Sequence, residues 1–268
     1  MKIAVVAPSC PLAPEAVELA QARASVFGAE LAVHPQCYLE AGHFAGTDEQ
    51  RLAALTEVMA DDSVDAVWFA RGGYGSNRIA AAASRAVSPT ARAKTYMGYS
   101  DAGFLLAAFH KAGLDVAHGP MVQDALRDGG MAAIDRALGW LVKRSEDALE
   151  PGLTPGMPAM AFNLAVLSNF VGTEIEPDFS GRDLLIEEVS EYEYAIDRQM
   201  YHVTGQAGVR NVAQMRMGRM SDILENDRPF GEDVDAIVRH WCQVSGITHG
   251  GQADIGHDSA NRVVPFSL

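Results

Sequence analysis

The first candidate for chemistry is the serine of the segment GYSD, residues 98–101. An apolar and aromatic run precedes Ser100 and an apolar stretch follows it, which predicts a strand that turns into a helix. Such a turn can expose a nucleophilic serine, and the backbone N–H of Asp101 could then stabilise an oxyanion. Ala102 stands where the pattern G-x-S-x-G has its second glycine. Taken alone, the segment therefore favours a serine that caps the helix.

A second candidate is the glycine-rich segment RGGYGS, residues 71–76, which directly follows the apolar run VDAVWFA. Three glycines in four positions permit unusual backbone conformations and allow N–H groups to point into an open space. A tight turn between strand and helix is the simpler interpretation. The spacing is not GxGxxG and no P-loop lysine follows, so a nucleotide site is poorly supported.

A serine nucleophile needs a base, and the base needs an acceptor that orients it. Two of the eight histidines are candidates: His118, expected at the end of a strand near the same sheet edge, and His257, in a polar loop after a glycine. For the acceptor, the segment LLIEEV offers Glu187 and Glu188. Alternation along a strand places these two on opposite faces, so at most one faces a given cleft. A solvated acidic surface is the alternative.

Short apolar runs alternate with helical patterns through the first half of the chain, which predicts βαβ crossovers and a mostly parallel sheet. Both glycine-containing segments follow strands, and ligands bind at the carboxyl edge of such sheets. We expect strands at 2–7, 29–33, 64–70, 94–99 and 114–118, and helices at 14–27, 48–60, 76–87, 101–112 and 131–143.

Residues 145–158, SEDALEPGLTPGMP, have the composition of a linker, with three prolines and two glycines. We therefore predict two domains, 1–150 and 151–268. In the second we expect helices near 163–171, 194–206 and 232–245, strands at 183–188 and near 211–217, and a final segment of loop and short strand.

Composition excludes several classes of function. The formal net charge of −14 argues against binding nucleic acid or an anionic membrane surface. No apolar stretch approaches the roughly 20 residues of a membrane span. The N-terminal apolar run is short and interrupted by proline, which favours a strand over a secretory signal. Three distant cysteines form neither a zinc motif nor a disulfide framework, so we expect no metal and a reducing cytoplasm.

Taken together, these segments resemble the LD-carboxypeptidase family of serine peptidases. The resemblance lies in FAGTDEQRLAAL (44–55), VDAVWFARGGYGSNRI (64–79), MGYSDAGFLLAAF (97–109), HGPM (118–121), the acidic segment within 172–200, and GH (256–257), in the same order. It implies a three-layer, Rossmann- or flavodoxin-like α/β domain, a smaller C-terminal α/β domain, and an active site between them.

The resemblance also implies roles for individual residues. Ser100 matches the nucleophile, His257 the base and Glu187 the acid of a triad, with Glu188 left open as the alternative acid. Oxyanion contacts carried over in the same way fall on Gly73 and Asp101. The candidate substrate contacts are Gly72, Tyr74, Asn163 and also Arg71, since an acidic protein that handles an anionic peptide needs local positive charge. Arg71 could instead anchor its own loop. Where the family usually has two glycines before Asn-Leu, this chain has Ala161-Phe162, which predicts a bulkier wall beside Asn163.

The function implied is hydrolysis, through an acyl-enzyme and without a cofactor, of the amide between an L-centre and a terminal D-amino acid. The expected substrate is murein tetrapeptide, trimmed during cell-wall recycling in a bacterial cytoplasm, and the expected assembly is a homodimer. Two alternatives remain open at this point. One is a microcin-immunity type of hydrolase that cleaves an acyl-adenylate-like amide, and the other is a binding protein without catalysis.

Overall fold

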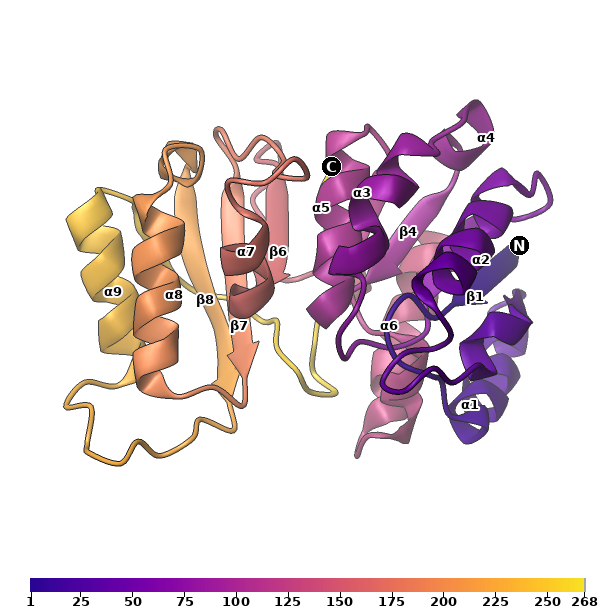
Figure 1. Cartoon of the computed structure of the whole chain (residues 1–268), viewed down its shortest axis with the longest axis horizontal. Helices are drawn as coiled ribbons and strands as arrows, with labels where there is room; N and C mark the ends of the chain where they lie inside the picture. Colours follow the sequence, from indigo (N-terminus) through magenta and orange to yellow (C-terminus); the bar gives the residue numbers. More distant parts are fainter. Residues whose placement is uncertain (268) are drawn as a thin grey trace.

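A six-stranded sheet carries both glycine-containing segments (Figure 1). The computed structural model describes residues 1–267. The strand order is β10-β5-β4-β3-β1-β2, and every neighbouring pair except β10–β5 is parallel. The strands are β1 (Lys2–Val6), β2 (Glu30–Val33), β3 (Ala66–Phe69), β4 (Thr95–Gly98), β5 (Asp115–His118) and β10 (Val264–Pro265).

Helices cover both faces of this sheet, which makes three layers. One face is covered by α1 (Pro14–Val26) and α6 (Gly130–Lys143), and the other by α2 (Asp48–Ala60), α3 (Asn77–Arg85) and α5 (Gly103–Lys111). This double cover explains why β3, AVWF, is apolar and buried at every position. Short helical connections complete the unit: η1 (Pro35–Tyr38), α4 (Pro89–Arg92), η2 (Ser100–Ala102), η3 (Val122–Leu126) and η4 (Glu146–Ala148).

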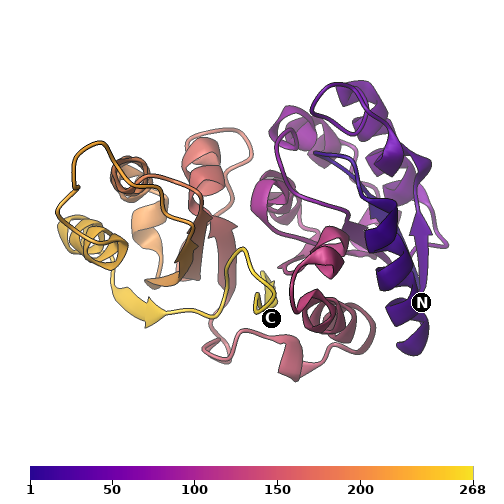
Figure 2. The ribbon, with the colours of Figure 1, turned by 90° about the horizontal axis from the view of Figure 1, so that it is seen from below.

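A second sheet, four-stranded and entirely parallel, has the order β6-β7-β8-β9. Its strands are β6 (Ala159–Asn163), β7 (Asp183–Val189), β8 (Gln214–Ser221) and β9 (His249–Gln252). The helices α7 (Leu164–Phe170), α8 (Glu193–Gly205) and α9 (Val234–Ser245) pack on one face, and the C-terminal segment crosses the other (Figure 2). A single turn, η5 (Val209–Asn211), precedes β8.

The predicted fold class, with a three-layer domain followed by a smaller α/β domain, is confirmed. Two strands were not predicted, β6 and β9. The sequences AMAFN and HGGQ are rich in alanine and glycine, which have low strand propensity. These strands form because β6 pairs with β7 and β9 pairs with β8. Each has five residues or fewer, and pairing with a distant segment leaves no periodic pattern in so short a sequence.

Aromatic side chains join the two domains: the ring of Phe104 on α5 lies 6.3 Å from that of Phe170 on α7. The Phe162 ring lies 4.9 Å from that of Phe170 and 5.2 Å from that of Phe266, in edge-to-face geometry. Phe162 is only 1% exposed and does not line the cavity beside Asn163. The prediction of a bulkier wall there is therefore wrong, because the side chain is used for packing between the domains.

The chain passes between the two sheets twice, through residues 145–158 and again after β9. The second passage brings β10 back to pair antiparallel with β5, so Val264 lies opposite His118. The boundary at residue 150 stays a prediction.

The helices of the structure are of ordinary length, and the longest, α6, has 14 residues. Within residues 1–267, no helix combines the length and apolar character that crossing a bilayer requires.

Candidate active site

Ser100 occupies a sharp turn between β4 and α5. Its backbone φ is +58°, in the left-handed region that non-glycine residues rarely adopt. The N-cap residue of the following turn η2 is Tyr99 and that of α5 is Ala102, and neither makes a side-chain capping hydrogen bond. The Ser100 hydroxyl therefore does not cap the helix, and the capping interpretation is wrong. The turn instead presents the hydroxyl to the space between the domains.

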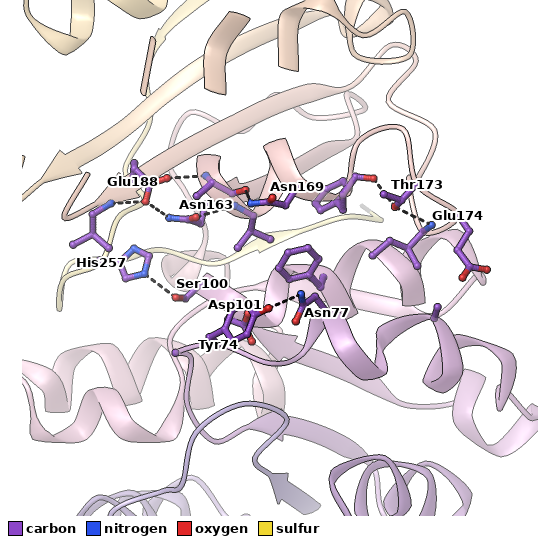
Figure 3. Close-up of a pocket in the computed structure, with 18 residues that line it drawn as sticks. Tyr74, Asn77, Ser100, Asp101, Asn163, Asn169, Thr173, Glu174, Glu188 and His257 are labelled. Atoms are coloured by element: carbon purple, nitrogen blue, oxygen red, sulfur yellow. Dashed lines mark hydrogen bonds between the residues drawn. The ribbon is translucent and has the colours of Figure 1, made fainter. Parts of the chain in front are cut away.

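His257 and Glu187 meet Ser100 from the second domain. The Nε2 atom of His257 lies 2.9 Å from Ser100 Oγ (Figure 3). Its Nδ1 atom lies 2.5 Å from Oε2 of Glu187. Glu187, near the end of β7, is fully buried, and the ring of Tyr99 packs 5.0 Å from that of His257. These contacts form the hydrogen-bonded order hydroxyl, imidazole, carboxylate on which nucleophilic catalysis by serine depends.

The other candidate base, His118, has a different partner. It is fully buried, and its Nε2 atom lies 3.1 Å from Oδ1 of Asn261. Asn261 also accepts from the backbone N–H of Gly256, directly before His257. His118 therefore supports the loop that carries His257, without a bond to Ser100.

The surroundings of His257 favour its protonated form overall, although burial opposes protonation. Burial lowers the pKa of His257, but the charge of Glu187 and the hydrogen bond to it raise that pKa to above its ordinary value of 6.5. The second carboxyl oxygen of Glu187 has no hydrogen-bond partner among residues 1–267. The negative charge of Glu187 is thus directed mainly at the imidazole, and it would stabilise the imidazolium that forms when Ser100 loses its proton.

Glu188 has a structural contact set of its own. Its carboxylate accepts from Asn163 Nδ2 at 2.6 Å and from the backbone N–H groups of Ala165 at 2.7 Å and Val189 at 2.8 Å. Burial raises the pKa of Glu188 to about 7. Glu188 therefore ties β7 to the start of α7, and Glu187 is the acid that contacts His257. Of the two acids, only Glu188 lines the cavity of about 540 Å³ between the domains. This agrees with the expectation that Glu187 and Glu188 point to opposite faces of β7.

The glycine loop approaches Ser100 closely because it lacks side chains. A Cβ on Gly72 would lie 2.9 Å from Ser100 Oγ. Gly73 has φ of +112°, and a Cβ there would lie 2.3 Å from the Sγ atom of Cys10. Both positions therefore require glycine, which leaves the Gly73 backbone beside the nucleophile.

The Asp101 carboxylate fixes the loop relative to the serine turn. It accepts from the backbone N–H of Ser76 at 2.8 Å and from the hydroxyl of Ser9. Burial raises the pKa of Asp101, while these hydrogen bonds oppose the rise. The sequence singled out Asp101 for its backbone N–H, and only the structure shows that its side chain joins three loops. The two predicted oxyanion donors, the N–H groups of Gly73 and Asp101, thus belong to one rigid assembly.

Two cavities meet at the serine. The larger, about 540 Å³, lies between the domains and is lined by Tyr74, Asn163 and Glu188 among others. The smaller, about 310 Å³, lies on the first domain and includes Arg71, Gly72 and Arg127. Gly73, Ser100 and His257 line both. All four residues predicted to contact substrate therefore border the site, and their roles stay predictions.

Arg127 and Tyr99 are site residues that sequence reasoning missed. Arg127 lies in the connection between η3 and α6, where no motif surrounds it, and only the fold brings it to the cavity. Tyr99 is part of the GYSD motif, so its position next to Ser100 could have drawn attention to it.

Among residues 1–267, no group of three or more histidine, cysteine, aspartate or glutamate side chains is arranged to hold a metal ion. A hydroxyl bonded to an imidazole, a carboxylate bonded to that imidazole, and backbone N–H groups nearby are the groups that acyl transfer by a serine would require.

Comparison with known families agrees with this arrangement. A family model described as the LD-carboxypeptidase N-terminal domain matches residues 3–119, and one described as the LD-carboxypeptidase C-terminal domain matches residues 159–268. The resemblance drawn from the motifs is therefore confirmed.

Curated relatives span most of the chain. A probable murein peptide carboxypeptidase of Bacillus subtilis is 33% identical, with 98% of this chain and 86% of the relative covered. The murein tetrapeptide carboxypeptidase of Pseudomonas aeruginosa is 25% identical, with coverage of 99% and 91%.

Solved structures share the fold at lower identity. A muramoyltetrapeptide carboxypeptidase from Oxalobacter formigenes superposes with a TM-score of 0.82 at 21% identity, covering 100% of this chain and 93% of that one. The microcin C7 self-immunity protein superposes with a TM-score of 0.78 at 16% identity, covering 100% and 91%.

Proposed function

The chain belongs to the LD-carboxypeptidase family of peptidases, and from this premise we propose that it is a serine carboxypeptidase that removes a terminal D-amino acid from a murein peptide. The bond cleaved is the amide between an L-centre and the D-residue. The observation that carries the proposal is the contact of His257 with Ser100 on one side and with the buried Glu187 on the other.

In the first half of the proposed reaction, His257 Nε2 takes the proton of Ser100 as Oγ attacks the carbonyl carbon. The carbonyl oxygen becomes an oxyanion that the N–H groups of Gly73 and Asp101 stabilise, each by roughly 3 kcal/mol of the barrier. His257 then gives the proton to the leaving nitrogen. The amide C–N bond breaks, the D-amino acid departs, and the peptide remains as an ester on Ser100.

In the second half, water attacks the ester, and His257 accepts a proton from that water. The same N–H donors stabilise the second oxyanion. Collapse of this intermediate breaks the bond to Oγ, returns the proton to Ser100 and releases the shortened peptide as a carboxylate. Glu187 keeps the imidazole in the tautomer whose Nε2 faces Ser100 throughout.

The direct test is release of D-alanine from L-Ala-γ-D-Glu-meso-diaminopimelyl-D-Ala. We expect Ser100→Ala to lower kcat by about 10⁴-fold or more, since loss of a serine nucleophile has effects of that size. The control is Ser245→Ala on α9, whose hydroxyl bonds only to carbonyls of its own helix. Release that persists in Ser100→Ala would overturn the serine mechanism.

The same assay separates the alternatives. A wild-type protein that releases no D-amino acid but cleaves an aminoacyl-nucleotide amide would have the immunity type of activity. Binding of murein peptide without cleavage of either compound would indicate a binding protein. By family resemblance we also propose a homodimer that acts in the cytoplasm, which analytical ultracentrifugation and cell fractionation would test.

A further inference from the structure

The two cavities on either side of Ser100 differ in charge. The smaller one is bordered by the guanidinium groups of Arg71 and Arg127 and by one carboxylate, that of Asp124. The acidic residues that border the larger one are Asp101, Glu174 and Glu188, next to the amides of Asn77, Asn163 and Asn169, and no arginine or lysine of residues 1–267 lines it. An anionic group therefore meets a favourable potential on only one side of the nucleophile.

The carboxylate of Asp124 is already fully engaged. It accepts from Tyr99 Oη at 2.9 Å, from the Met121 N–H at 2.8 Å and from Arg127 Nε at 2.7 Å. It is only 5% exposed, so it acts from behind to orient Arg127 and Tyr99. The open side of the cavity is left to the two guanidinium groups.

Both arginines keep donors for a ligand. Arg71 is exposed and makes one long hydrogen bond, from Nη1 to the carbonyl of Pro11 at 3.3 Å. Arg127 donates through Nε to Asp124 and through Nη2 to the Tyr99 hydroxyl at 3.4 Å, and its side chain is 43% exposed. Since a guanidinium has five N–H donors, most of those of Arg71 and Arg127 have no partner within residues 1–267. Such donors bind carboxylates with paired, charge-assisted hydrogen bonds.

From this asymmetry we infer that the smaller cavity is the leaving-group subsite, where Arg71 and Arg127 hold the carboxylate of the terminal D-amino acid. The acyl part of the peptide then occupies the larger cavity between the domains. This inference rests on the proposed function and adds to it the direction of binding and the residues that require a free carboxyl end.

The size of the cavities supports the same direction. A single amino acid leaves, whereas a chain of several residues stays on the serine, and the cavities measure about 310 and 540 Å³ respectively. The two arginines also explain how a protein of net charge −14 can accept an anionic peptide. A peptide that continues beyond the D-residue has no carboxylate at this position, so the enzyme would act only at chain ends.

The test compares the murein tetrapeptide with its C-terminal carboxamide, which lacks the negative charge. We expect the wild type to prefer the free acid in kcat/KM by about a hundredfold, the order of charge-assisted bonds to two arginines. Arg71→Gln and Arg127→Gln should each lower kcat/KM for the acid by about tenfold or more, with little effect on the amide. In the double variant Arg71→Gln/Arg127→Gln the preference for the acid should vanish. When Arg127→Lys replaces Arg127→Gln in that variant, part of the preference should return.

Arg239→Gln is the matched control, because Arg239 is also an exposed arginine that pairs with a carboxylate of the same segment, on the distant helix α9. It should keep the full preference for the acid. Equal losses on acid and amide in Arg71→Gln, or a preference that survives in the double variant, would overturn the inference. A wild-type protein that cleaves neither compound would instead contradict the proposed function itself.

Discussion

A single buried carboxylate, that of Glu187, raises the pKa of His257. Glu187 is fully buried, bonds to His257 Nδ1 and leaves its other oxygen without a partner among residues 1–267. The pKa of His257 is therefore above 6.5 despite burial. The neutral imidazole, which alone can accept the Ser100 proton, is populated above that pKa and lost as the pH falls through it.

We therefore predict that kcat/KM falls on the acid side with an apparent pKa above 6.5. In Glu187→Gln the attraction for the imidazolium is lost, so this limb should move to lower pH. The plateau should also drop by about 10³- to 10⁴-fold, because an amide can favour the wrong tautomer of histidine. Rates of D-alanine release between pH 5 and 9 would measure both effects.

Glu188→Gln is the matched control, since the two acids are neighbours on β7. The charge of Glu188 also raises the pKa of His257, but less than that of Glu187. The acid limb should therefore move less than in Glu187→Gln, and the plateau should fall less. A larger effect from Glu188→Gln would make Glu188 the acid of the triad.

At the scale of elements, the site depends on two loops that follow the neighbouring strands β3 and β4. Glycine lets the first loop reach the Ser100 hydroxyl, and the carboxylate of Asp101 joins the second loop to Ser76 in the first. The backbone N–H groups of both loops are thus positioned before substrate binds. Donors that are held in advance stabilise a transition state without the cost of reorganisation.

This arrangement predicts that Gly73→Ala lowers kcat by about 10²- to 10³-fold, the effect of losing one oxyanion donor. Its Cβ would overlap the Sγ atom of Cys10 at 2.3 Å, so the loop must shift. Gly156→Ala is the control, because Gly156 has φ of +81° but open space around its Cβ position.

Both variants should lose about 1 kcal/mol of stability from the positive φ, and Gly73→Ala should lose more because of the overlap with Cys10. Steady-state kinetics and urea denaturation of the two variants would separate activity from stability. Equal kcat values in Gly73→Ala and Gly156→Ala would show that the Gly73 N–H does not stabilise the oxyanion.

At the scale of the molecule, buried charges connect the linker to the second sheet. Arg216 on β8 bonds to both carboxyl oxygens of Glu150 at 2.8 Å and lies 3.4 Å from Asp183. Glu150 also accepts from the N–H of Asp254 at 3.0 Å, three residues before His257. The linker, the sheet and the loop that carries His257 therefore hold one another in place.

Arg216→Met should lower the free energy of unfolding by about 3 to 5 kcal/mol, because it leaves the carboxylates of Glu150 and Asp183 buried without a cation. In Arg239→Met, which breaks an exposed pair with Asp235, the loss should stay below about 1 kcal/mol. Urea denaturation would measure both. Similar losses in the two variants would show that the buried network contributes no more than a surface ion pair.

The amino-acid sequence was enough to predict the alternation of strands and helices, the fold class and the two loops at the carboxyl edge of the first sheet. These features are local, because apolar periodicity, glycine and turn residues act on their own segment. The sequence also indicated Ser100, His257 and Glu187 through family motifs. Their catalytic roles stay predictions, as do the roles of Gly73 and Asp101 and of the substrate contacts.

Which side chains meet became clear from the folded chain alone. Ser100 and His257 are 157 positions apart and come from different domains, so their contact depends on how α7 and its aromatic neighbours dock against α5. Within the second domain, the arrangement of β7, α7 and the C-terminal loop places Glu187 against His257 and Glu188 against the start of α7. The same loop brings Asn261 to His118 of the first domain. The position of Arg127, the pairing of β6 with β7 and the pairing of β10 with β5 likewise arise from contacts between distant segments. Such contacts are selected by packing across the whole chain, which no short pattern of residues records.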